Sequence, residues 1–149
     1  METLNHQKIA IIGLWHQGIV AAACLSELGF EITAADLDKK KIDNLSKGII
    51  PIYEPGLQEL IQKNLENGRL KFVSDLSLAV TKKEYVFLMF DTRVDENDIT
   101  DLKDIFDAIE IFSDSLEDNC ILYNTSQVPV GTSEKIIDKI KEKNHNIHI

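Results

Sequence analysis

Short apolar segments alternate with longer amphipathic segments along the 149-residue chain. The short segments, rich in β-branched residues, predict buried strands, whereas apolar residues at three- and four-residue spacing predict helices that bury one face. The predicted strands cover residues 8–13, 31–36, 70–73, 85–90, 120–124 and 147–149. The predicted helices cover residues 18–29, 38–48, 57–68, 75–80, 102–116 and 132–144, and Thr132 or Ser133 is expected to cap the last of them.

The alternation of strands and helices predicts the class of fold. It is typical of an α/β protein in which a parallel sheet has right-handed crossovers and helices on both faces. The length suits one domain over residues 1–149. Because the final predicted strand is cut short, we expect this chain to be the N-terminal part of a longer protein.

Charge and composition exclude several classes of partner. The formal net charge is −9, and the only basic cluster is at residues 39–41, so we expect no binding to nucleic acid or to an anionic membrane surface. No apolar run approaches the ~20 residues of a membrane span, and the first residues lack the layout of a signal peptide, which favours a cytoplasmic location. Cys24 and Cys120 are expected to be reduced core thiols, and no metal-ligating pattern is present.

The segment GLWHQG follows the first predicted strand and is similar to a dinucleotide-binding loop. Gly13 and Gly18 occupy the first and third glycine positions of G-x-G-x-x-G, but Trp15 occupies the second, where the backbone normally approaches a pyrophosphate. Asp36 ends the second predicted strand, where a carboxylate can accept from both ribose hydroxyls of an adenosine, and it would repel a 2′-phosphate. Alternatively, the glycines serve only packing and Asp36 caps the next helix, although Asp38 is the better-placed cap.

Trp15 raises a question about this loop. A positive φ at this position would strain the backbone by about 1–3 kcal/mol. The loop can keep its ligand if the indole swings outward. We therefore expect a partly exposed Trp15, a loop that keeps the shape of a dinucleotide-binding turn, and weak binding of NAD.

Several segments resemble the UDP-glucose/GDP-mannose dehydrogenases, which oxidise a nucleotide sugar at C6 with two NAD. The most specific is GIIPIYEPGLQELI, which is similar to the family's G-x-x-P-I-x-E-P-G-L. The others are KIAIIGLWHQG, NGRLKFVSDLSLAV, VFLMFDTRVDENDITDL and YNTSQVPVGTSEKI, so the resemblance covers essentially the whole chain. It implies an NAD-binding domain with a Rossmann-type doubly wound sheet of about six strands, in the order 3-2-1-4-5-6.

The resemblance also implies where NAD is bound. The implied cofactor-binding positions are Gly13, Leu14, Trp15, His16, Gln17, Gly18, Asp36, Lys41, Thr92 and Gln127. Gln127 stands where the family has a threonine beside the nicotinamide, and Asp91 and Arg93 replace the two prolines of P-T-P. Arg93 could bind a cofactor phosphate, but an ion pair with Asp91 or Asp95 is favoured.

These departures leave two interpretations open. The leading one is the NAD-binding domain of a nucleotide-sugar 6-dehydrogenase, which holds NAD for oxidation of the sugar C6 alcohol to a carboxylate and forms a homodimer when intact. The alternative is a non-catalytic nucleotide-binding or assembly module with a degenerate cofactor loop. The family's catalytic cysteine, lysine and asparagine would lie beyond Ile149, so we expect no catalytic residue in this chain.

Two further parts of the chain carry weaker expectations. His16 is expected to be a solvent-facing loop residue, whereas Tyr53, Glu54 and Pro55 are expected to fix the packing of the loop before the third predicted long helix. The acidic segment at residues 95–101 lacks the glycine and terminal glutamate of a calcium loop, so we expect it to be solvated.

Overall fold

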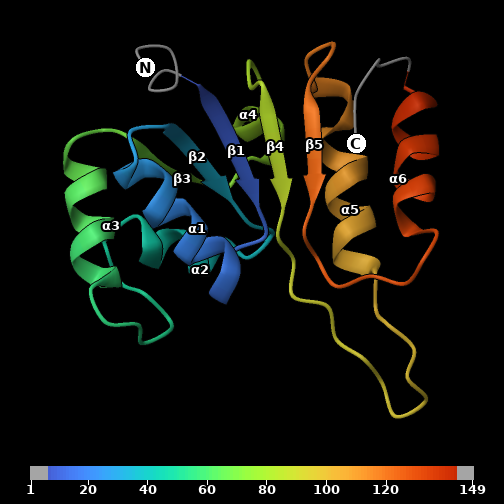
Figure 1. Cartoon of the computed structure of the whole chain (residues 1–149), viewed down its shortest axis with the longest axis horizontal. Coiled ribbons are helices and arrows are strands. Elements are labelled where there is room, and N and C mark those ends of the chain that lie inside the picture. Colours follow the sequence, from blue (N-terminus) through green and yellow to red (C-terminus); the bar gives the residue numbers. More distant parts are fainter. Residues whose placement is uncertain (1–6, 144–149) are drawn as a thin grey trace.

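A parallel sheet forms the centre of the computed structural model, which describes residues 7–143 (Figure 1). Its five strands lie in the order β3-β2-β1-β4-β5, and every neighbouring pair is parallel. The strands are β1 (Lys8–Ile12), β2 (Glu31–Ala35), β3 (Leu70–Val73), β4 (Tyr85–Leu88) and β5 (Ile121–Asn124). The predicted doubly wound order is therefore confirmed over these strands, and the sixth predicted strand, at 147–149, lies outside the described residues.

Helices cover both faces of the sheet, as predicted. One apolar cluster joins Ile9 and Ile11 of β1 to α1, α2 and α3, and a second joins Ala10 and Ile12 to α4, α5 and α6. The alternation of β1 side chains between two buried layers explains why residues 9–12 of the strand are all apolar. The helices are α1 (His16–Glu27), α2 (Lys39–Leu45), α3 (Leu57–Glu66), α4 (Leu76–Val80), α5 (Lys103–Phe112) and α6 (Thr132–Lys141).

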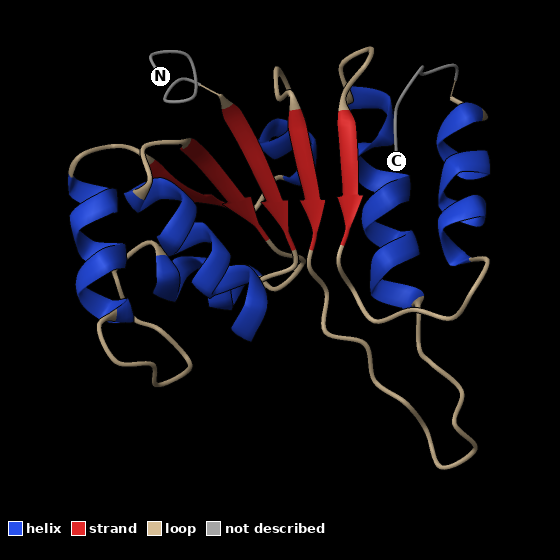
Figure 2. Ribbon diagram, viewed as in Figure 1, coloured by secondary structure: helices blue, strands red, loops and turns tan. Residues whose placement is uncertain are grey.

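The carboxyl ends of the strands meet at one edge of the sheet, and the long connections emerge there (Figure 2). The connection between β4 and α5 extends beyond this edge as an arm closed by an antiparallel bridge between Val94 and Thr100. Asp95 stabilises the arm because its Oδ1 accepts from the backbone N–H groups of Asn97 and Ile99. These bonds hold the pKa of the Asp95 carboxyl below its usual value. Within the described residues, no three or more His, Cys, Asp or Glu side chains lie together in a way that could hold a metal ion.

Most helix bounds differ from the predicted ones by a few residues, as for α1, which begins at His16 instead of residue 18. The predicted cap of α6 is wrong, since Gly131 (φ +88°) precedes the helix and no side chain caps it. The hydroxyl of Thr132 instead donates to the carbonyl of Pro129 at 2.7 Å, which closes the preceding turn. The predicted helix over 102–116 ends at Phe112 and continues as a 3₁₀ turn, Ser113–Ser115.

The two thiols have different environments. Cys120 is buried as expected, and burial together with the nearby Glu117 raises the pKa of its thiol to about 11. Cys24 is exposed, so its prediction as a core thiol is wrong. The buried stripe of α1 consists of Gly18, Ile19, Ala22, Ala23 and Ser26, and Cys24 lies outside it.

None of the helices within residues 7–143 has the length and apolar character that a membrane span needs.

Candidate functional site

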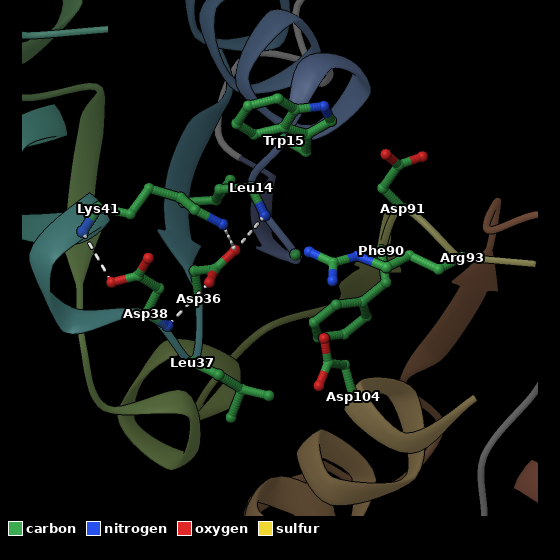
Figure 3. Close-up of a pocket in the computed structure, with 11 residues that line it drawn as sticks. Leu14, Trp15, Asp36, Leu37, Asp38, Lys41, Phe90, Asp91, Arg93 and Asp104 are labelled. Atoms are coloured by element: carbon green, nitrogen blue, oxygen red, sulfur yellow. Dashed lines mark hydrogen bonds and ion pairs between the residues drawn. The ribbon is translucent and has the colours of Figure 1, made fainter. Parts of the chain in front are cut away.

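A cavity of ≈ 420 Å³ opens at the carboxyl edge of the sheet, between the ends of β1, β2 and β4 (Figure 3). A second cavity of ≈ 220 Å³ adjoins it, since Trp15, Phe90 and Asp91 line both. Open α/β sheets bind ligands at this edge, where the strand order reverses on either side of β1. The first cavity is lined by Gly13, Leu14, Trp15, Asp36, Leu37, Asp38, Lys41, Phe90, Asp91, Arg93 and Asp104.

The turn after β1 requires both of its glycines. Gly13 has φ +95°, and a Cβ there would lie 2.8 Å from the backbone nitrogen of Phe90. A Cβ on Gly18 would lie 2.0 Å from the carbonyl oxygen of Gly13, closer than any tolerated contact. The predicted roles in turning the chain and in close helix–strand packing are therefore confirmed. The same geometry means that the glycines are needed by the fold whether or not a ligand binds.

Trp15 lies at the residue before α1 and faces both cavities. Its φ of −115° and ψ of −145° are extended, so the backbone carries no positive-φ strain. The residue is 44% exposed, which confirms the expectation of a partly exposed Trp15. The carbonyl of Trp15 accepts the first hydrogen bond of α1, from Ile19 at 3.0 Å. The turn therefore keeps its shape with a tryptophan in the second glycine position.

The N-terminus of α1 points its donors toward the cavities. No side chain caps this helix. The first backbone N–H groups of an α-helix have no partner within the helix, and they carry a partial positive charge. His16 and Gln17, in this first turn, line the second cavity. The arrangement suits an anionic group placed between the two cavities.

Asp36 is the most constrained side chain of the site. It is 6% exposed, and its Oδ2 accepts from the backbone N–H of Leu14 at 2.7 Å and from Nζ of Lys41 at 2.9 Å. Its Oδ1 accepts from the backbone N–H of Asp38 at 2.9 Å (Figure 3). Asp38, not Asp36, caps α2, because its Oδ1 accepts from the backbone N–H groups of Lys40 and Lys41. Asp36 instead ties the end of β2 to the turn after β1.

These contacts reduce the number of ribose hydroxyls from which Asp36 can accept a hydrogen bond. A carboxylate has about four acceptor positions, and the donors from Leu14, Lys41 and Asp38 occupy all but one. One ribose hydroxyl can therefore donate to Oδ1 without displacing a partner. A second hydroxyl requires Nζ of Lys41 to move from Oδ2.

Thr92 and Gln127 connect the loops that follow β4 and β5. The hydroxyl of Thr92 donates to the backbone carbonyl of Gln127 at 2.5 Å, and both residues line the second cavity. The structure thus gathers the sequence-predicted positions at one edge. Gly13, Leu14, Asp36 and Lys41 line the first cavity, His16, Gln17, Thr92 and Gln127 line the second, Trp15 lines both, and Gly18 is buried beneath the turn.

Two predictions near the site differ in part or in full from the structure. His16 is exposed as expected, but it belongs to α1, not to a loop, and its Nε2 lies 2.6 Å from Oε1 of Glu54. Glu54 thereby fastens the loop before α3 to the start of α1, whereas Tyr53 is 90% exposed and fixes nothing there. The expected ion pair of Arg93 with Asp91 or Asp95 is wrong, because Arg93 forms no ion pair within residues 7–143.

Sequence reasoning missed several residues that line the first cavity. Leu37 and Phe90 supply apolar walls, and Asp104 enters from the first turn of α5. Leu37 directly follows Asp36, and Phe90 ends the predicted strand at 85–90, so the fold order alone could have placed them. Asp104 had no such signal, because its position depends on the length and path of the arm after β4.

The fold and the site together define a dinucleotide-binding domain of the Rossmann type. Its marks are the parallel sheet, the glycine turn into an uncapped helix, and a buried acidic residue at the end of β2. Residues 7–149 match the family model described as the UDP-glucose/GDP-mannose dehydrogenase family, NAD binding domain. The chain belongs to this family, and the matched region is the family's NAD-binding domain.

Curated relatives support this assignment. The chain is 34% identical over 137 residues to UDP-glucose 6-dehydrogenase TuaD of Bacillus subtilis, a match that covers 92% of this chain and 30% of the relative. It is 36% identical over 138 residues to UDP-glucose 6-dehydrogenase of Rhizobium meliloti, covering 92% of this chain and 32% of that protein. The chain therefore spans about a third of the length of these relatives.

Solved structures share the fold. A ternary complex of GDP-mannose dehydrogenase from Pseudomonas aeruginosa superposes with a TM-score of 0.84 at 31% identity, covering 91% of this chain and 32% of that one. A UDP-glucose dehydrogenase from Pyrobaculum islandicum superposes with a TM-score of 0.89 at 24% identity, covering 99% of this chain and 36% of that one.

Proposed function

We propose that this chain binds NAD across the two cavities, and that within a longer protein it holds NAD for oxidation of the C6 alcohol of a UDP- or GDP-sugar to a carboxylate. The observation that carries the proposal is the buried Asp36, held at the end of β2 by Leu14 and Lys41 with one acceptor position left. When bound, NAD supplies the hydride acceptor. The residues of this chain bind and orient it.

The first cavity fits the adenosine half of the cofactor. Leu37 and Phe90 provide apolar walls for a flat base, and Oδ1 of Asp36 accepts from a ribose hydroxyl. A 2′-phosphate in place of that hydroxyl would meet the Asp36 carboxylate, and Asp38 lies beside it. Like charges at such a contact cost several kcal/mol, so the site favours NAD over NADP.

The second cavity fits the nicotinamide half. The loops after β4 and β5 meet there through the Thr92–Gln127 hydrogen bond, and the first turn of α1 closes the cavity from the other side. The Gln127 amide can donate and accept, as the nicotinamide carboxamide requires. The resemblance to nucleotide-sugar dehydrogenases supports a nucleotide sugar as the partner of the intact protein, homodimer assembly and a cytoplasmic location.

Fluorescence of Trp15 provides the test, because Trp15 is the only tryptophan of the chain and faces both cavities. Bound NADH should quench this emission saturably by energy transfer, and NAD should reverse the quenching. NADPH should bind at least about tenfold more weakly, since 1.4 kcal/mol corresponds to a factor of ten. Emission that stays flat to millimolar NADH would contradict the proposal and favour a non-catalytic assembly module. Equal affinities for NADH and NADPH would contradict the role of Asp36.

A further inference from the structure

The first cavity is acidic, although the proposed ligand is an anion. The carboxylates that line it are Asp36, Asp38, Asp91 and Asp104, and the cations are Lys41 and Arg93. A pyrophosphate placed between the two cavities therefore meets a surplus of like charge on the side of the first cavity. Besides the uncapped N-terminus of α1, its binding then depends on any cation that is not already neutralised by a carboxylate.

Arg93 is that cation. Nζ of Lys41 is paired with Asp36 at 2.9 Å, whereas no carboxylate in the described part of the chain forms an ion pair with Arg93. The side chain extends from the loop after β4 into the cavity, with its guanidinium directed toward the Leu14 side (Figure 3). Its backbone is fixed, because the Arg93 carbonyl accepts from Asp101 at 2.8 Å at the base of the arm.

The position of Arg93 also complements the change at Trp15. In G-x-G-x-x-G loops the second glycine lets backbone N–H groups approach the pyrophosphate. Here Trp15 places a Cβ and an indole at that position, and the nearest N–H before it, that of Leu14, is bound to Asp36. The bulk of Trp15 and the bond from Leu14 to Asp36 therefore restrict the approach of a phosphate to the backbone donors of this loop. A guanidinium can replace them, since it donates two parallel hydrogen bonds to an oxyanion and remains charged.

We infer that Arg93 binds the pyrophosphate of the dinucleotide and replaces the contact that Trp15 removes from the loop after β1. The inference rests on the proposed function. It assigns Arg93 a phosphate-specific role, so the residue should discriminate ligands that carry a diphosphate, such as NADH and ADP, from adenosine, which lacks it.

The experiment compares Arg93→Ala and Arg93→Lys with a matched control. Arg69→Ala removes the other arginine of the chain, an exposed residue just before β3 that lines neither cavity. NADH affinity is measured from Trp15 quenching, and ADP and adenosine are titrated as competitors. Arg93→Ala should weaken NADH and ADP about ten- to hundredfold, the range expected for lost charge-assisted hydrogen bonds. Adenosine binding should change less than about twofold, Arg69→Ala should resemble the unmodified chain, and Arg93→Lys should fall between.

Other outcomes distinguish a failure of the Arg93 inference from a failure of the proposed function. If the unmodified chain binds NADH and Arg93→Ala binds it within about twofold, the inference is wrong and the proposed function stands. If Arg93→Ala weakens adenosine as much as ADP, Arg93 shapes the cavity instead of binding phosphate, which also overturns the inference. If the unmodified chain binds no NADH, the proposed function and the inference fail together.

Discussion

Replacement of Gly18 by alanine should destabilise this domain by about 3 kcal/mol or more, the upper range for overpacking a tight contact. Within a helix, Gly→Ala ordinarily stabilises by roughly 0.5–1 kcal/mol. Here the added Cβ would lie 2.0 Å from the carbonyl oxygen of Gly13, so α1 or the turn after β1 must move. Because α1 and this turn pack against the centre of the sheet, neither can move without loss of packing. A loss of this size should lower the midpoint of thermal unfolding by roughly 6–12 °C.

Gly68→Ala provides the matched control for this prediction. Gly68 has φ +77° with nothing within 4 Å of the added Cβ, so only the backbone conformation is penalised. That penalty is about 1–2 kcal/mol. Circular dichroism during heating or urea unfolding measures both variants. A Gly18→Ala chain that is as stable as Gly68→Ala would show that α1 does not pack on the turn as closely as described.

Replacement of Asp36 by alanine should have the second largest effect. It should lower both the affinity for NAD and the free energy of unfolding. The variant loses a ribose acceptor, which should weaken NAD by about 1.5–3 kcal/mol, or roughly 10- to 150-fold. It also leaves the backbone N–H of Leu14 without its partner. An unpaired buried donor costs about 1–3 kcal/mol, so the free energy of unfolding should fall by that amount. Calorimetric titration with NAD and urea unfolding measure the two losses.

Asp104→Ala separates the role of Asp36 from the general charge of the cavity. Asp104 also lines the first cavity, but it forms no ion pair within the described residues and does not hold the turn after β1. Its loss removes a negative charge from a cavity that receives an anionic cofactor, so NAD affinity should stay the same or rise slightly. If Asp36→Ala and Asp104→Ala change NAD affinity equally, Asp36 has no specific ribose contact.

The order of the fold was predictable because each strand and helix has its own apolar pattern. The continuous apolar run of β1 predicts burial on both faces, and the structure places its alternate residues in two separate clusters. Local capping was less predictable. Asp38 caps α2 as expected, but Thr132 does not cap α6, because Gly131 adopts a positive φ and the Thr132 hydroxyl binds Pro129.

The site was predictable where it depends on positions just after strands. Gly13, Asp36 and Thr92 follow β1, β2 and β4, and the parallel sheet brings these ends together. Contacts between distant loops carried no comparable signal. The His16–Glu54 contact joins residues 38 positions apart, and Asp95, a predicted partner of Arg93, instead accepts from the backbone of its own loop. Neither arrangement follows from spacing along the chain.

The central claim is that NAD binds at the carboxyl edge of this sheet, and an amide map tests it most directly. In a ¹⁵N-labelled chain titrated with NAD, the largest shifts should fall on the turn after β1 and the first turn of α1, on residues 36–41, and on Thr92 and Gln127. Shifts should be absent at the amino ends of the strands, around Lys8 and Lys83. An unchanged spectrum, or shifts concentrated at the amino ends, would contradict the account.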